Sequence, residues 1–421
     1  MADTSYIRDL FIHKIFTMNT LKQWNILIAD DDEKIHRILV NPYFNEDLLG
    51  KPVSFITAKD KTKTFEILKE KHNEIAVILY DIALASDNNL EVIDFIRIKL
   101  QNKKLQIIIR SDKSINFSDK EITDNYVIHD YIDDDNTDGT LIFTLKSAVS
   151  TYNDIEQLEK QNRIIEQQKN ELESSIKAAS YIQKALFPKK KILKKHFPNS
   201  FIIHKPHQKV SGDFYYFSNI LGKHIIITAD CTGHGVPASL TSMLGLSFLK
   251  RIIETDKVFD PANILTKLDN EILKIFKNKE AEGTAHDGMD ISICTIDLEN
   301  KTLLVSGAVN SVILIHKNSI KEIEVSKYGI GHLNTKEKNF ITEQHVIEKG
   351  DIIFMFSDGF YGQVSEKKDR PFGKRKFHGL LRKTVEKNMK NQKNKLLKHF
   401  LEIKGKNEQT DDILIIGIKI P

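Results

Sequence analysis

The residues of this chain best suited to chemistry are aspartates at the ends of apolar segments in its second half. A single aspartate at such a place is usually a turn or cap residue. Four acidic sites of this kind in one region predict a shared acidic centre. They are Asp213 in VSGDFYY, Asp230 in IIITADCTGHG, Asp358 in IIFMFSDG, and Asp411 with Asp412 in QTDDILIIGI.

Carboxylates without thiolates or clustered histidines suit hard divalent cations, above all Mg²⁺ and Mn²⁺. Two such ions roughly 3.5 to 4 Å apart can activate a water and clamp a phosphate for in-line attack. The protein then supplies positioning and charge rather than a covalent nucleophile. The C-terminal aspartates therefore indicate two-metal hydrolysis of a phosphate ester.

A second set of polar residues ends apolar segments in the N-terminal third. Asp30 and Asp31 follow WNILIA, Asp81 follows IAVILY, and Ser111 follows LQIIIR. These segments alternate with helical patterns from about residue 23 to 150, which predicts parallel βαβ units in a doubly wound sheet. Because sites gather at the carboxyl ends of parallel strands, we expect these carboxylates to lie together. They could then bind Mg²⁺ and offer one phosphoacceptor.

Residues 146–187 contain neither proline nor glycine and carry apolar residues at alternating spacings of three and four. The pattern predicts a heptad repeat with polar residues at some a positions. Because a buried asparagine at such a position selects a two-stranded coil, we expect a parallel dimeric signalling helix. The alternative is a single amphipathic linker that packs on its own domains. The repeat consists of Ile155, Leu158, Asn162, Ile165, Lys169, Leu172, Ile176, Ala179, Gln183 and Leu186.

Composition excludes several classes of protein. Among 421 residues, 62 Lys and Arg exceed 58 Asp and Glu by only four, too few to imply nucleic acid. The β-rich C-terminal end also offers no DNA-binding helix-turn-helix. Cys231 and Cys294 lack metal-binding spacing and cannot form a disulfide scaffold. No apolar run approaches the ~18 residues that span a bilayer. We therefore expect a cytoplasmic protein with no nucleic-acid or membrane partner.

The N-terminal pattern resembles the receiver domain of response regulators over nearly all of residues 23–150. The resemblance implies a flavodoxin-like fold with Asp30 and Asp31 as Mg²⁺ ligands, Asp81 as phosphoacceptor and Ser111 as switch hydroxyl. It also implies a histidine kinase as phosphodonor. The family places a lysine after the fifth strand, whereas the only charged residues from Tyr131 to Asp135 in this sequence are the acidic Asp133, Asp134 and Asp135. The alternative is a degenerate receiver that docks or dimerises without phosphate.

The C-terminal segments resemble the metal-dependent (PPM, type 2C) Ser/Thr protein phosphatases of the bacterial SpoIIE-like branch. The resemblance implies an α-β-β-α sandwich with two Mn²⁺ or Mg²⁺ ions between its sheets. Asp213, Asp230, Asp358 and Asp411 would bind the metals, with Asp230 bridging both. Cys231 would contribute its backbone carbonyl. Asp412 would hold the metal ligands in position without binding a metal itself. The matching segments are VSGDFYY, ADCTGHGVPASLTSML, DGMDISICTID, FMFSDG and QTDDILIIG.

Neighbouring residues leave two interpretations open. His234 either protonates the leaving serine oxygen or hydrogen-bonds within its turn, and Lys209 either meets substrate phosphate or is a surface residue. Asp287 and Asp290 could shape the substrate edge or a third metal site, but we expect a structural turn.

We therefore expect four parts: an extension over residues 1–22, a receiver-like domain over 23–145, a coiled-coil helix over 146–187 and a phosphatase domain over 188–421. The predicted function is a receiver-regulated phosphoserine/phosphothreonine protein phosphatase. By family analogy, its substrate would be a phosphorylated anti-sigma-factor antagonist of the sulfate-transporter/anti-sigma (STAS) type. The alternative function is a non-catalytic scaffold that binds a signalling partner.

Overall fold

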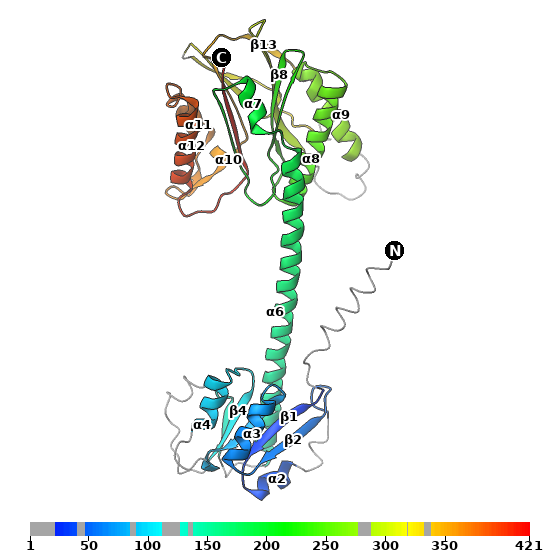
Figure 1. Ribbon diagram of the computed structural model, residues 1–421, viewed down its shortest axis with the longest axis vertical. Coiled ribbons are helices and arrows are strands. Elements are labelled where there is room, and N and C mark those ends of the chain that lie inside the picture. The colour runs from blue at the N-terminus through cyan, green and yellow to red at the C-terminus, as the bar shows by residue number, and fades with distance from the viewer. Residues whose placement is uncertain are drawn as a thin grey trace. The chain divides into compact units, whose positions relative to one another are not determined.

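The computed structural model describes residues 22–39, 47–84, 90–111, 127–133, 138–276, 288–317, 319–331 and 338–421. The chain forms two compact units, residues 1–169 and 170–421 (Figure 1). The expected extension over residues 1–22 lies almost entirely outside the described residues. The expected boundaries near residues 145 and 187 stay predictions.

The first unit contains the expected parallel sheet, with strands in the order β2-β1-β3-β4-β5. Helices α2, α3 and α4 connect its strands, and α4 continues into a π-helical turn. The elements are β1 (Trp24–Ala29), α2 (Glu33–Leu39), β2 (Val53–Ala58), α3 (Lys61–Lys71), β3 (Ile75–Asp81), η2 (Ile82–Leu84), α4 (Glu91–Asp94), η3 (Phe95–Lys99), β4 (Gln106–Ser111) and β5 (Asp130–Asp133).

Every residue of the central strands β1 and β3 is buried, which explains why these two strands are almost wholly apolar. Successive side chains of a strand point to opposite faces. In β1, Ile26 and Ile28 join the core cluster that includes α2 and the start of α6. Leu27 and Ala29 join the cluster that includes α3 and α4. The parallel arrangement brings the carboxyl ends of β1, β3 and β4 to one edge.

Helix α6 (Asp138–Leu186) is continuous over 49 residues and runs from the first unit into the second. It begins before the predicted coil because its first turns bury Leu145 and Tyr152 in the core of the first unit. Further along, Leu158, Ile165 and Leu172 are 58 to 62% exposed. The coiled-coil pairing stays a prediction.

The second unit contains two five-stranded sheets, in the orders β13-β10-β9-β8-β7 and β12-β11-β14-β17-β6. One apolar cluster joins side chains from both sheets and so fills the space between them. The first sheet packs its other face on α8 and α9, and the second sheet packs its other face on α10 to α12. The unit therefore has the four layers, helix, sheet, sheet and helix, that the resemblance implies.

The strands and helices of this unit have the following bounds: α7 (Lys190–His196), β6 (Ser200–Lys205), β7 (Phe214–Ile220), β8 (Lys223–Cys231), α8 (Val236–Lys250), η4 (Arg251–Thr255), α9 (Pro261–Phe276), β9 (Met289–Asp297), β10 (Thr302–Ala308), β11 (Val312–His316), β12 (Ser319–Ile323), β13 (Glu343–Val346), β14 (Ile352–Phe356), α10 (Gly359–Gly362), β15 (Val364–Ser365), β16 (Arg370–Pro371), α11 (Lys374–Arg382), α12 (Met389–Lys404) and β17 (Ile413–Lys419). Across the described residues, none of the helices has the length and apolar character needed to cross a membrane.

Candidate active site

The predicted aspartates of the second unit lie at the ends of four paired strands. Asp213 directly precedes β7, and Asp230 stands near the end of its antiparallel partner β8. Asp358 follows β14, and Asp411 precedes the antiparallel partner β17. Ser357 connects the two sheets at this end, because its Oγ donates a 2.6 Å hydrogen bond to Asp213 Oδ2. Strand ends from both sheets thus meet around Asp213.

Asp213 forms the buried floor of this site and has no exposed surface. Its Oδ1 atom is buried without a hydrogen-bond partner, whereas Ser357 satisfies Oδ2. Burial raises the pKa of Asp213 well above its usual range, and the negative charge of Asp230 adds to this rise. A buried carboxylate with an unused oxygen is costly unless a cation compensates it.

Asp230 faces Asp290 directly across the β8–β9 ladder. Burial raises the pKa of Asp230 well above its usual range, and the charges of Asp358 and Asp411 contribute. Burial also raises the pKa of Asp290 to about 6, with a smaller contribution from Asp358. Like charges directly opposite each other destabilise a sheet, so this pair favours a bound cation.

The structure corrects the expectation for Asp290, which belongs to strand β9 rather than to a turn. The sequence offered one usable signal, because Asp290 directly precedes the alternating run ISICTID. The register that sets Asp290 opposite Asp230 is a tertiary property. Asp287 lies outside the described residues.

The opposite side of the site is open to solvent. Asp358 is exposed and Asp411 is half-buried. Burial raises the pKa of Asp358 and also that of Asp411. The negative charge of Asp358 raises the pKa of Asp411 further. His234 is exposed at this rim, with its ring centroid 5.0 Å from that of His207. Anionic substrates could therefore reach the carboxylates from this side.

Asp412 organises the loop that leads to Asp213. Its Oδ1 accepts the backbone N–H of His207 and its Oδ2 accepts that of Gly212, each at 2.6 Å. Gly212 packs so closely on the carbonyl of Cys231 that an added Cβ would lie 3.1 Å from that oxygen. The only part of Cys231 that can face a ligand here is its main chain, because its side chain is buried in the apolar core.

Lys209 does not point toward the aspartates. Its Nζ lies 3.1 Å from Glu173 Oε2 on helix α6. The next contacts along this helix are Ser180 Oγ, which donates to Lys209 O at 2.6 Å, and Gln183 Nε2, which donates to Ser211 O at 2.6 Å. The end of α6 is thus attached to the loop that precedes Asp213.

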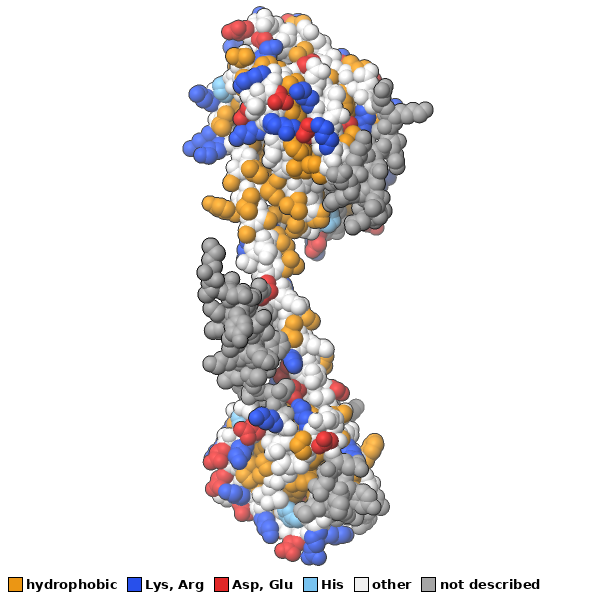
Figure 2. All heavy atoms as spheres, turned by 90° about the vertical axis from the view of Figure 1, so that its right-hand side faces the viewer, with side chains coloured by type: hydrophobic (Ala, Val, Ile, Leu, Met, Phe, Trp, Pro, Cys, Tyr) orange, Lys and Arg blue, Asp and Glu red, His pale blue; other side chains and the backbone are white. Residues whose placement is uncertain are grey.

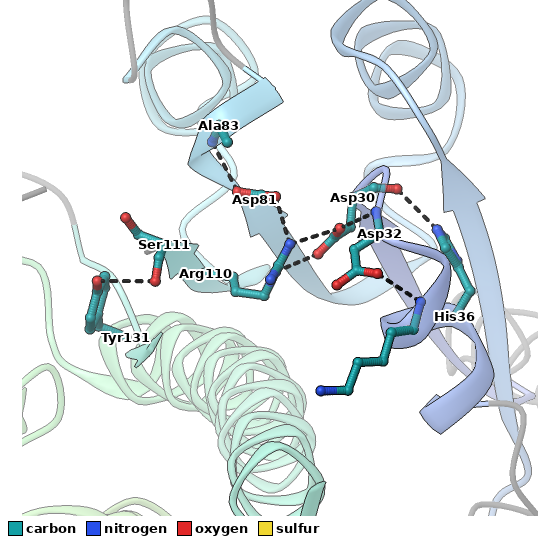
Figure 3. Close-up of polar contacts among 9 residues, drawn as sticks. Asp30, Asp32, His36, Asp81, Ala83, Arg110, Ser111 and Tyr131 are labelled. Atoms are coloured by element: carbon teal, nitrogen blue, oxygen red, sulfur yellow. Dashed lines mark hydrogen bonds and ion pairs between the residues drawn. The ribbon is translucent and has the colours of Figure 1, made fainter. Parts of the chain in front are cut away.

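The predicted residues of the first unit also lie together. Asp30, Asp31 and Asp81 each place one carboxylate oxygen within 4.8 Å of the other two. Asp30 and Asp81 are buried and Asp31 is exposed. Ser111 is buried and ends the neighbouring strand β4. Arg110, which sequence reasoning did not include, donates hydrogen bonds to both buried carboxylates (Figure 3).

Among the described residues, Asp30, Asp31 and Asp81 form the one group of three possible metal ligands whose oxygens all lie within 4.8 Å of one another. The C-terminal aspartates are spread over a wider site.

Comparisons with known proteins support the assignment of the second unit. Residues 222–421 match the family model of Stage II sporulation protein E (SpoIIE). The SiaA-PP2C domain of Pseudomonas aeruginosa is similar in structure, with a TM-score of 0.55 and 26% identity, over 60% of this chain and 98% of that one. The C-terminal region thus matches a SpoIIE-like, PP2C-type phosphatase domain in family model and in fold, and PP2C phosphatases depend on metal ions, typically Mn²⁺ or Mg²⁺.

A further relative is the 3'3'-cGAMP-specific phosphodiesterase 2 of Vibrio cholerae. It is 24% identical over 168 residues, which cover 39% of this chain and 31% of that protein. The match thus spans less than a third of the relative's length.

Proposed function

We propose that residues 188–421 form a metal-dependent phosphoserine/phosphothreonine protein phosphatase whose active site is the aspartate cluster between the two sheets. The observation that carries the proposal is the buried carboxylate of Asp213, with one unpaired oxygen, beside Asp230 in a PP2C-type domain. Among the described residues, no Lys or Arg forms an ion pair with these carboxylates, and such a concentration of negative charge is suited to bind divalent metal ions.

The side chains of Asp213, Asp230, Asp358 and Asp411 would hold two Mn²⁺ or Mg²⁺ ions, together with the carbonyl of Cys231. When bound, the ions would supply the charge that lowers the pKa of an attacking water and neutralises the phosphate. Asp290 is added to the predicted set because it faces Asp230 across the ladder. Ser357 and Asp412 act as positioning residues, since they hold Asp213 and the preceding loop.

His234 is the proposed proton donor to the leaving serine or threonine oxygen. Gln208 Nε2 lies 3.4 Å from His234 Nδ1. If that amide donates, Nδ1 is the acceptor and the imidazole proton resides on Nε2. From there it would be transferred to the leaving oxygen. The role of Lys209 in substrate binding stays a prediction, since its ammonium group is paired with Glu173.

We propose that helix α6 transmits a regulatory signal to the active site. The residues of the repeat that are exposed along this helix, Leu158, Ile165 and Leu172, recur at intervals of seven and would form a homodimer interface. Figure 2 shows apolar side chains exposed along α6. The end of the helix contacts the loop before Asp213, so a change in the helix would alter the position of that ligand. The N-terminal domain would supply the signal.

The proposed substrate is a phosphorylated cytoplasmic protein, and a STAS-type antagonist is the expected class by family analogy. A histidine kinase acting on Asp81 is what the receiver resemblance implies, and no comparison tests it. The chemistry at the aspartates does not depend on either assignment.

The test is hydrolysis of p-nitrophenyl phosphate and of a phosphoserine peptide by the full chain with Mn²⁺, Mg²⁺ or EDTA. Asp230→Asn should abolish metal-dependent turnover because it removes a charge without removing volume. Asp297→Asn, at the opposite end of the same sheet, is the matched control and should retain activity. Absence of both turnover and calorimetric metal binding in the unmodified chain would favour the non-catalytic scaffold.

A further inference from the structure

A guanidinium group lies inside the acidic cluster of the first unit. Arg110 Nε donates to Asp30 Oδ2 at 2.6 Å, and its Nη2 donates to Asp30 Oδ1 at 3.0 Å and to Asp81 Oδ2 at 2.7 Å. All three side chains are at least nine-tenths buried. Figure 3 shows the guanidinium between the two carboxylates, at the carboxyl ends of β1, β3 and β4.

Backbone groups complete the hydrogen bonding of these two carboxylates. The N–H of Asp32 donates to Asp30 Oδ1 at 2.8 Å, and the N–H of Ala83 donates to Asp81 Oδ1 at 2.9 Å. Each of the four oxygens of Asp30 and Asp81 therefore has a donor from the chain itself. Fork-shaped pairing of arginine with carboxylates is among the strongest hydrogen-bonding arrangements in proteins.

A divalent ion would need the same oxygens that Arg110 uses. Mg²⁺ requires oxygen ligands at about 2.0 to 2.1 Å in a nearly octahedral arrangement. With guanidinium nitrogens 2.6 to 3.0 Å from three of those oxygens, the ion and the arginine would be two cations in contact distance of one another. Exposed Asp31 alone is not enough to hold the ion against this repulsion. The residues present therefore do not fit a bound Mg²⁺ while Arg110 stays in place.

We propose that Arg110 takes the place of the divalent cation in this cluster, so that the domain neither binds Mg²⁺ there nor accepts a phosphoryl group at Asp81. Phosphoryl transfer would require Asp81 Oδ2, the oxygen to which Arg110 donates. Arg110 then holds the two buried carboxylates permanently, and the domain does not signal through phosphorylation of Asp81. This inference is independent of the phosphatase activity.

The single tryptophan of the chain allows a test in the full-length protein. Trp24 is buried in β1 of the same domain, and its Nε1 donates to Leu48 O at 2.7 Å. Urea unfolding followed by its fluorescence reports on the stability of this unit. The measurement is made with and without millimolar MgCl₂ on the unmodified protein, Asp81→Asn, Arg110→Met and Arg37→Met. Arg37 is a matched surface control, with 81% of its side chain exposed.

Mg²⁺ should shift the urea midpoint of the unmodified protein by no more than it shifts the midpoint of Asp81→Asn. Arg110→Met should lower the midpoint in EDTA and should recover it with Mg²⁺, because the ion can then enter. Arg37→Met should behave like the unmodified protein. Acetyl phosphate should leave no hydroxylamine-labile phosphate on the unmodified chain.

Hydroxylamine-labile phosphate on the unmodified chain after acetyl phosphate would overturn the proposal, and so would either of two unfolding results. One is a Mg²⁺-dependent rise of the midpoint in the unmodified protein that Asp81→Asn abolishes. The other is an Arg110→Met protein that folds but does not respond to Mg²⁺. If Arg110→Met does not fold, the comparison of the unmodified protein with Asp81→Asn decides the question by itself.

Discussion

Gln183 holds both backbone groups of Ser211. Its Nε2 donates to Ser211 O at 2.6 Å, and its Oε1 accepts the N–H of Ser211 at 3.1 Å. Gln183 lies near the end of α6, and Ser211 lies two residues before Asp213. A single amide side chain thus connects the long helix to the loop that positions the buried carboxylate.

Replacing Gln183 by alanine should weaken metal activation more than it weakens the fold. The N–H of Ser211 would lose its partner, at about 1 to 3 kcal/mol for a buried group, and the Ser211 carbonyl would keep the 3.3 Å hydrogen bond that Ser242 Oγ donates. We expect the Mn²⁺ concentration for half-maximal activity to rise several-fold while the melting temperature falls only modestly. Gln168→Ala, at an exposed position of the same helix, is the control. Equal activation curves for both variants would rule out this coupling.

Ser357→Ala should shift the acid limb of the activity profile toward higher pH. The Ser357 hydroxyl stabilises ionised Asp213 and so lowers its pKa against the effect of burial. Without it the pKa of Asp213 rises further, and a higher pH is needed to free the carboxylate for a metal. The measurement is the pH dependence of turnover at subsaturating Mn²⁺. Ser306→Ala removes a buried hydroxyl elsewhere in the same sandwich and should leave the profile unchanged.

Asp290→Asn should stabilise the protein in EDTA at neutral pH. The pKa of Asp290 rises from 3.8 to about 6 on folding, so ionisation opposes folding above that range. This cost is largest above pH 6 and disappears as the pH falls from about 6 toward 4, where the folded state takes up the proton first. The shift of about two units corresponds to up to about 3 kcal/mol.

Differential calorimetry at several pH values measures this effect. The gain from Asp290→Asn should be present at pH 7.5 and absent near pH 4. Asp297→Asn should behave in the opposite direction, because hydrogen bonds from Asn300 lower the pKa of that carboxylate in the folded state. A loss of stability at pH 7.5 in Asp290→Asn would contradict the raised pKa.

Gly359→Ala should disrupt the site, whereas Gly362→Ala should not. An added Cβ at Gly359 would collide with the carbonyl oxygen of Asp412, while one at Gly362 would meet nothing within 4 Å. Both glycines belong to the short helix α10. Because main-chain atoms must move, overpacking of about 1 to 3 kcal/mol is expected for the first variant. Melting temperature and p-nitrophenyl phosphate turnover should both fall, and equal values for the two variants would refute the steric explanation.

The exposed repeat on α6 predicts a dimer that charged residues would separate. A double variant, Ile165→Asp with Leu172→Asp, should convert the dimer to a monomer in size-exclusion chromatography with light scattering. Both side chains are about 60% exposed in the single chain, so the fold should not change. Glu166→Lys, beside them on an exposed position, is the control. A monomeric unmodified chain would refute the dimer.

The sequence by itself predicted an acidic group in each half of the chain and the order of the strands and helices that carry these groups. Strand-end aspartates are readable because apolar runs mark buried strands and because parallel strands bring their carboxyl ends to one edge. The family match over residues 222–421 agrees with the phosphatase-type interpretation of the second region.

Only the tertiary structure decided which side chains lie against each cluster. Arg110 pairs with residues 80 and 29 positions away, and an arginine at the end of a strand can equally well extend into solvent. Asp290 became a member of the site through the register of β8 and β9. Gln183 fits the heptad pattern as a polar a position, yet its amide binds a loop of the same chain. Sequence patterns constrain which face a side chain lies on, whereas the partner across that face is set by packing between distant segments.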